Sequence, residues 1–221
     1  MDLRADIYSE VHKGLRGALT EILVDAGRLD VEDSDAVSGF NERLRSVAEL
    51  LESHAEYEDL YFHPLLDGTD DDLVKAFEDS HRELDAELSA AVEAYGNLAD
   101  AAADQVLALG RQAYYRLAAF IGAYFVHISN EELEIMPRMQ SRRSDAEIME
   151  AVITLRANIP PAKMARFLST MIPAMNVQER VAMFSGMKAA APPEALQKNC
   201  DLARALLDDG DWQDLSERVG L

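Results

Sequence analysis

The chain has 221 residues, of which 48% are hydrophobic, so it is long and apolar enough to bury the core of one large domain. Its formal net charge of −20 repels phosphate, and nucleic acid is therefore not expected as a partner. No apolar run approaches the roughly 20 residues that a membrane-spanning helix needs, and the polar first residues do not resemble a secretory signal. The single cysteine, Cys200, excludes a disulfide framework within the chain. We therefore expect a cytoplasmic protein with no membrane partner.

Four long helices are predicted in the first 140 residues, because apolar residues recur there at helical spacing. Their expected ranges are 3–27, 36–63, 70–97 and 100–136. On the last of them, Leu107 and Tyr114 are expected to face inward. Pro64 and Pro137 each follow a helix that they should end or bend, because proline has no backbone N–H to donate. Runs of β-branched residues are absent and the loops are short, so we predict an all-α fold in which residues 1–140 form an antiparallel, up-down four-helix bundle.

Residues 141–221 differ from this bundle, because prolines are more frequent there and the predicted helices are shorter. Their expected ranges are 143–157, 161–172, 177–190, 193–208 and 211–218. Asn176 and Glu179 are spaced as in a capping box, and Pro193 suits a first helical position. We interpret this part as a C-terminal annex of shorter helices or a small second domain. Its methionines fill either a core or a surface that binds a second copy or another protein; they include Met164, Met171, Met175, Met183 and Met187.

The pattern that organises the chain is a histidine followed four residues later by a glutamate, and it occurs twice. His54 precedes Glu58, and His127 precedes Glu131. On a helix, residues four apart lie one turn apart on the same face, so each copy places an imidazole beside a carboxylate. Two such pairs on facing helices would form a site of nitrogen and oxygen ligands.

An upstream histidine repeats together with each pair. His12 and His81 are each followed by a cation and then by two leucines at the same spacing, so the chain contains one half-motif twice. A lone histidine on an apolar helix face is usually a hydrogen-bonded core residue. Four such histidines, one on each predicted helix and two of them paired with a carboxylate, instead predict a metal site. Its candidate ligands are His12, His54, Glu58, His81, His127 and Glu131.

The mixture of imidazole and carboxylate in this set suits iron, manganese or zinc. Six ligands are too many for one tetrahedral zinc ion, which takes four. They suit two octahedral ions between facing helices, bridged by the glutamates and completed by an oxo, hydroxo or water ligand. We therefore predict two iron ions, with zinc or manganese as the alternatives.

Over roughly residues 1–140, the ordered set of a histidine, His-x3-Glu, a histidine and a second His-x3-Glu resembles the hemerythrin-like (HHE cation-binding) proteins. The resemblance implies a hemerythrin-like bundle in which these six residues hold a non-heme di-iron centre. It also implies that the centre meets a small diatomic ligand, such as dioxygen or nitric oxide, or a peroxide.

Two features depart from the pattern of the oxygen-carrying hemerythrins. Those proteins have a second histidine four residues after the third-helix ligand, where this chain has Asp85, and a longer spacing on the last helix that ends in aspartate. Asp85 is then either a substitute ligand or a solvent-exposed residue. One ion would have fewer protein ligands, which favours solvent, peroxide or redox chemistry over reversible oxygen storage.

The fifth histidine, His63, is not expected to replace the missing ligand. It lies nine residues after His54, which is roughly half a turn round an ideal helix. It also aligns in the internal repeat with Met136, an apolar position. His63 should therefore point away from the site, unless the bend at Pro64 turns it inward.

The leading hypothesis is a hemerythrin-like di-iron protein that binds, senses or detoxifies a small oxidant (dioxygen, nitric oxide or peroxide) or handles iron. A second hypothesis is a di-iron peroxidase or oxidase-type enzyme. No sequence motif names an electron donor or a path for turnover, so the residues do not decide whether the chain is an enzyme. A third hypothesis is a metal-free helical interaction protein whose histidines are core residues.

Overall fold

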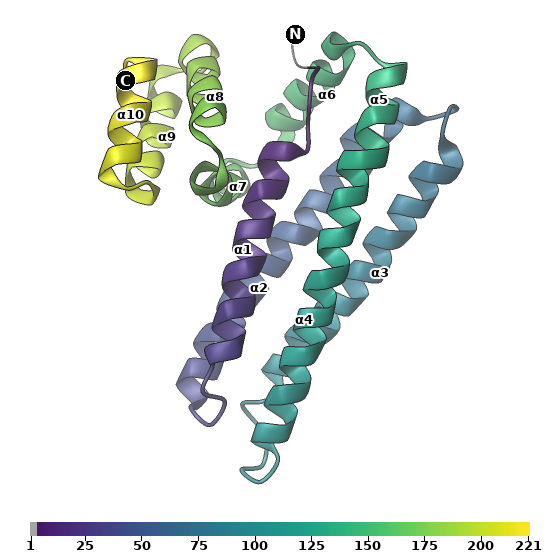
Figure 1. Ribbon diagram of the computed structural model, residues 1–221, viewed down its shortest axis with the longest axis vertical. Helices are drawn as coiled ribbons and strands as arrows, with labels where there is room; N and C mark the ends of the chain where they lie inside the picture. Colours follow the sequence, from purple (N-terminus) through teal and green to yellow (C-terminus); the bar gives the residue numbers. More distant parts are fainter. Residues whose placement is uncertain (1–3) are drawn as a thin grey trace. The chain divides into compact units, whose positions relative to one another are not determined.

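A computed structural model describes residues 4–221, and among these residues it contains helices and turns but no strand (Figure 1). The predicted all-α class is confirmed. By their contacts the residues fall into two compact units. The first contains Ala18–Asn158 together with the described residues up to Ile7, and the second contains Tyr8–Gly17 and Ile159–Leu221. None of the described helices has both the length and the apolar composition that crossing a bilayer requires.

Long helices dominate the first unit. They are α2 (Ser34–Tyr57), α3 (Asp71–Gly96), α4 (Val106–Asn130) and the C-terminal part of α1 (Ser9–Arg28). Helix α3 packs against both α2 and α4. The C-terminal part of α1 reaches α2 through an ion pair between Asp25 and Arg43, whose atoms lie 3.1 Å apart. The same part of α1 meets α4 where Gly27 lies against the ring of Tyr114.

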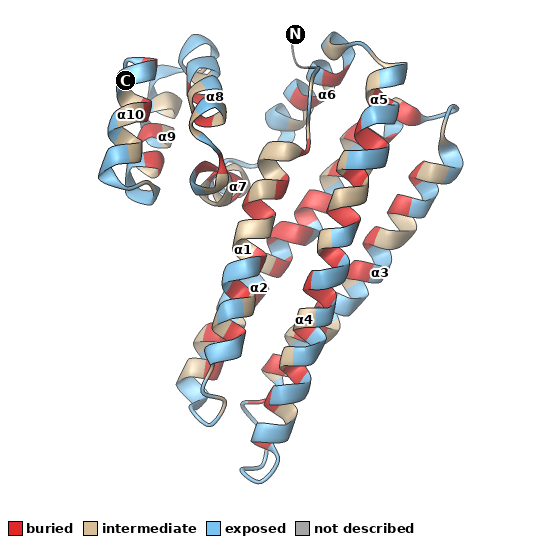
Figure 2. Ribbon diagram, viewed as in Figure 1, coloured by how far each residue is buried: buried red, intermediate tan, exposed pale blue. Residues whose placement is uncertain are grey.

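The core of this unit consists of the apolar side chains that recur along each long helix (Figure 2). Burial of a leucine or phenylalanine side chain contributes roughly 1.5–3 kcal/mol, so these rows hold the helices together. The prediction that the fourth helix faces inward from Leu107 onward is wrong at the start of the helix. Helix α4 begins at Val106 and not near residue 100, and the Leu107 side chain is 59% exposed. The largest fully buried side chains of the core include Phe40, Leu44, Leu51, Leu88, Leu117 and Ile121.

Two helices leave the α form at the same point of the internal repeat. Each continues from its glutamate as a five-residue π-helix, η1 at Glu58–Phe62 and η3 at Glu131–Ile135. A proline follows each π segment, Pro64 in the 3-10 turn η2 (His63–Leu66) and Pro137 in α5 (Met136–Arg142). Because proline lacks an N–H and crowds the preceding turn, the helix cannot continue unchanged through that point. The bends predicted at these prolines therefore take the form of π turns, which are frequent at functional sites.

The second unit has its own apolar core under the helices α7 (Pro161–Ala174), α8 (Val177–Ala190), α9 (Pro193–Leu206) and α10 (Asp209–Val219). The core interpretation of the methionines is confirmed, because they pack in or against this cluster. Asn176 and Glu179 form the predicted capping box, and Pro193 occupies the first turn of α9. The buried residues of the cluster are Leu168, Ile172, Met175, Phe184, Cys200, Ala203, Leu215 and Val219.

The segment Tyr8–Gly17 belongs to the second unit because it packs against α7 and α8. A Cβ atom added at Gly14 would lie 3.0 Å from the backbone nitrogen of Met171, so only glycine fits this close approach without a shift. Lys13 pairs with Glu179 at the start of α8. By its contacts, the first unit therefore ends at Asn158. The domain boundary near residue 140 stays a prediction, because the contacts do not show which parts of the chain fold independently.

Candidate metal centre

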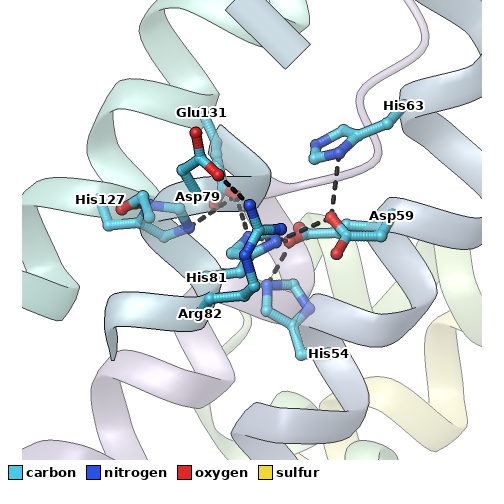
Figure 3. A network of polar contacts seen from close by, with 10 residues as sticks. His54, Asp59, His63, Asp79, His81, Arg82, His127 and Glu131 are labelled. Atoms are coloured by element: carbon cyan, nitrogen blue, oxygen red, sulfur yellow. Dashed lines mark hydrogen bonds and ion pairs between the residues drawn. The ribbon is translucent and has the colours of Figure 1, made fainter. Parts of the chain in front are cut away.

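Five of the six predicted ligands lie in the first unit, and all five are buried. Helix α2 carries the first histidine, α3 the second and α4 the third, while the two glutamates begin the π segments η1 and η3. The exposed fraction does not exceed 6% for any of them, so the centre is screened from bulk solvent. These ligands are His54, Glu58, His81, His127 and Glu131. Figure 3 labels all of them except Glu58.

In each His-x3-Glu pair the imidazole and the carboxylate are in contact, as the helical spacing predicts. His54 Nε2 lies 3.0 Å from Glu58 Oε1, and His127 Nε2 lies 3.0 Å from Glu131 Oε1. His81 joins the two pairs, because its Nε2 atom is 3.4 Å from Glu58 Oε2 and 3.2 Å from Glu131 Oε1. Three imidazoles and two carboxylates from three helices therefore converge on one buried region.

Glu131 is common to two sets of close ligand atoms. It offers an atom within 4.8 Å of ligand atoms from His54 and Glu58, and it also forms such a set with His81 and His127. A carboxylate shared in this way can bridge two cations, because each of its two oxygens accepts a separate ligand bond.

Two of the histidines, His81 and His127, are held from outside by groups that contact their second ring nitrogen. Asp59 Oδ1 accepts a hydrogen bond from Nδ1 of His81 over 2.8 Å, and Ser80 Oγ lies 3.0 Å from Nδ1 of His127. Such contacts fix the ring orientation and leave Nε2 directed at the centre. Asp59 and Ser80 are not among the predicted ligands. Their only signal is that each is the immediate neighbour of a predicted ligand.

A family model described as the hemerythrin HHE cation binding domain matches residues 4–139. The chain belongs to this family. The matched range includes all six ligands that the sequence predicts. No curated protein and no solved structure matches the chain.

Electrostatics in this hemerythrin-family centre favour positive charge. Burial lowers the pKa of His81, but three surrounding carboxylates outweigh burial and raise this pKa to about 12. Burial raises the pKa of Asp59, but hydrogen bonds from His63 and His81 outweigh that effect and hold the pKa well below its ordinary value. The carboxylates around His81 are those of Asp59, Glu131 and Glu58.

A metal cation fits this donor set. Buried carboxylates are costly unless positive charge compensates them, and the exposed fractions of Glu58 and Glu131 are 1% and 0%. The proton that His81 retains supplies only one positive charge among three carboxylates. Divalent ions bound at the same ligands would displace this proton and supply more charge. Imidazole nitrogen and carboxylate oxygen are also the donors that iron, manganese and zinc accept.

His63 lies at the edge of the hemerythrin-family centre, as the alternative of an inward turn at the bend before Pro64 predicts. Its side chain is 1% exposed, and its Nδ1 atom lies 3.0 Å from Asp59 Oδ1. Its ring stacks parallel to that of His81, with the centroids 5.7 Å apart. The π turn η1 and the 3-10 turn η2 change the rotation per residue between His54 and His63, so ideal α-helical geometry fails here.

Asp85 is half-buried beside His81 and belongs to no set of close ligand atoms among the described residues. It lines a surface pocket together with Asp59 and His81. Burial raises the pKa of Asp85, the nearby charge of His81 lowers it, and the charge of Asp59 raises it again, with a net rise. Asp85 therefore matches neither predicted alternative fully, because it is neither in a set of close ligand atoms nor fully exposed to solvent.

His12, the sixth predicted ligand, lies in the part of α1 that belongs to the second unit. Its side chain is fully buried, and its ring stacks on that of Tyr8 with the centroids 5.0 Å apart. Its distance from the other five ligands stays a prediction that rests on the internal repeat.

Proposed function

We propose that this chain is a non-heme di-iron protein that binds, senses or detoxifies a small oxidant, namely dioxygen, nitric oxide or peroxide, or handles iron. The observation that supports two ions is the position of Glu131 in two sets of close ligand atoms. The proposal includes the antiparallel, up-down order of the four long helices, which places ligands from neighbouring helices face to face.

Each ion would have its own histidines. His54 and Glu58 would hold one ion, His81 and His127 would hold the other, and Glu131 would serve both. The sequence repeat and the family match support His12 as a further ligand of the first ion. Iron bound at these residues supplies one-electron redox chemistry and Lewis acidity.

The chain itself would orient the ligands and exclude water. Asp59 and Ser80 hold two imidazole rings in place, so their Nε2 atoms need no reorientation when an ion binds. Phe77 and Tyr124 cover His127, with ring centroids 5.6 Å and 6.2 Å from its own. A dry site strengthens every electrostatic contact within it.

Reaction with an oxidant is favoured over reversible oxygen storage. Where oxygen-carrying hemerythrins have a second third-helix histidine, this chain has the half-buried Asp85. Fewer protein ligands at one ion leave positions for solvent or an oxidant. A cytoplasmic location, with no nucleic-acid partner, completes the proposal and agrees with the net charge of −20 and the single cysteine.

The test is the metal content and the visible absorption spectrum of protein purified aerobically without added metal and then dialysed. We expect two iron ions per chain and absorption bands in the visible range. His54→Ala and Glu131→Ala should abolish these bands, whereas Glu83→Gln, which changes an exposed carboxylate on α3, should preserve them.

Other outcomes would change the proposal. A single zinc or manganese ion per chain would retain the site and remove the oxygen chemistry. Absence of any metal, together with no uptake of ferrous iron under anaerobic conditions, would contradict the site altogether. Rapid turnover of peroxide by the iron-loaded protein, lost in Glu131→Ala, would favour the enzyme hypothesis over a binding or sensing role.

A further inference from the structure

A third set of close ligand atoms lies outside the six predicted ligands. Asp59, His63 and Glu78 each offer one ligand atom, and these atoms lie within 4.8 Å of one another. Asp59 and His63 lie in the consecutive turns η1 and η2, and Glu78 lies in α3, so two parts of the chain build the cluster. Asp59 and His63 are four residues apart, so helical spacing places them on the same side.

His63 distinguishes this cluster from an ordinary group of surface acids. Its side chain is 1% exposed, and its Nε2 atom has no hydrogen-bond partner among residues 4–221. A buried polar atom without a partner is costly, commonly by about 1–3 kcal/mol. Packing does not demand a histidine here, because the equivalent position of the internal repeat holds the apolar and equally buried Met136. A cation held among Asp59, His63 and Glu78 would take one ring nitrogen of His63 as a ligand.

We propose that Asp59, His63 and Glu78 form a further cation site, separate from the di-iron ligands, that takes a divalent transition-metal ion such as ferrous iron, manganese or zinc. One imidazole with two carboxylates is a donor set for these ions, whereas calcium and magnesium prefer oxygen alone. Three protein ligands leave room for water in the remaining positions. The site should therefore bind its ion less tightly than the buried centre and lose it on dialysis.

One ligand of this site, Asp59, faces an acidic pocket on the surface of the first unit. Asp59 lines that pocket, and its side chain is 37% exposed while that of His63 is 1% exposed. Arg82, a cation of the pocket wall, is paired with Asp79. Clefts lined with one sign of charge concentrate the opposite ion, so the pocket raises the local concentration of cations. The other acidic residues of the pocket are Glu52, Glu56 and Asp85.

Asp59 can serve the further site and the di-iron ligands together. Its Oδ1 atom accepts from Nδ1 of His81, and a carboxylate has about four lone-pair positions on its two oxygens. His63 and Glu78 do not serve both sites, since neither belongs to the sets of ligand atoms that contain Glu131. Substitution of Glu78 therefore tests the further site most directly, whereas His63 also contacts Asp59 and stacks on His81.

The experiment is titration of the metal-free, full-length protein with Co²⁺, followed by visible absorption, and with Zn²⁺, followed by calorimetry. We expect His63→Gln and Glu78→Gln each to bind one ion fewer than the unchanged protein. Glu83→Gln removes an exposed carboxylate from the same helix and should bind the full number. Circular dichroism checks folding, and Glu78 is half-buried, so Glu78→Gln remains informative if His63→Gln fails to fold.

The outcomes separate this inference from the proposed function. Equal stoichiometry in Glu78→Gln and the unchanged protein would overturn the further site. If all bound ions are lost in Glu131→Ala but retained in Glu78→Gln, the di-iron proposal stands and the further site is wrong. A single ion that survives Glu131→Ala but is lost in Glu78→Gln would support the further site alone.

Discussion

Oδ1 of Asp59 accepts a hydrogen bond from Nδ1 of His81 over 2.8 Å, and this contact fixes which ring nitrogen of His81 faces the two glutamates. Asp59 thus acts on the centre through His81. Its influence reaches the site although it is not among the sets of ligand atoms that contain Glu131.

Asp59→Asn should weaken metal binding at the centre by about 10–100-fold, because the neutral amide accepts less strongly from Nδ1 of His81 and leaves Nε2 a less basic, less fixed ligand. Competition with a chelator measures the affinity. Asp85→Asn is the matched control, since Asp85 lies in the same pocket but, among residues 4–221, makes no hydrogen bond to a ligand histidine. Equal affinity of Asp59→Asn and the unchanged protein would show that Asp59 does not position His81.

Some of this centre could be predicted from the sequence and some could not. The pairs His54 with Glu58 and His127 with Glu131 follow from the period of the α-helix, and the repeat adds His81. Those features depend only on local spacing. Asp59 lies in η1 and contacts His81 of α3. The spacing of residues within one helix does not predict a contact with another helix.

His63 shows a second limit of reasoning from spacing. An angle around a helix can be counted only while the rotation per residue stays constant, and η1 and η2 interrupt it between His54 and His63. Pro64 indicated where the α-helix fails but not the form of the turn that replaces it. The orientation of His63 therefore depended on tertiary structure.

The stability of the metal-free protein should fall as the pH rises above neutrality. The pKa of His81 is about 12 in the folded chain against an ordinary value of 6.5, so its protonated form stabilises the fold. This contribution is complete below pH 6.5 and is lost as the pH rises toward 12, with a slope of at most about 1.4 kcal/mol per pH unit. Denaturant unfolding from pH 6 to pH 9 measures the slope. His81→Gln should flatten it, and parallel curves for the two proteins would contradict the assignment.

Cys200 should react slowly with thiol reagents in the folded protein. Burial raises the pKa of this thiol, and the negative charge of Asp201 raises it further, so little reactive thiolate forms near neutral pH. The side chain is 9% exposed within the core of the second unit. Because the chain has one cysteine, a colorimetric thiol assay reports on this residue alone. The rate should rise to that of an unfolded peptide in denaturant. Rapid reaction without denaturant would show that the second unit opens readily.

Gly14→Ala should destabilise the second unit, whereas Gly17→Ala on the same helix should not. A Cβ atom at Gly14 would lie 3.0 Å from backbone atoms of Thr170 and Met171, which cannot yield as a flexible side chain does. Overpacking of this kind costs about 1–3 kcal/mol and exceeds the gain of about 1 kcal/mol from replacing a helical glycine by alanine. At Gly17 the new atom would meet only the Ala174 side chain, at 4.0 Å, so the helical gain should remain. Denaturant unfolding of both variants measures the difference in free energy. Equal stabilisation by the two alanines would mean that α1 and α7 can separate without loss.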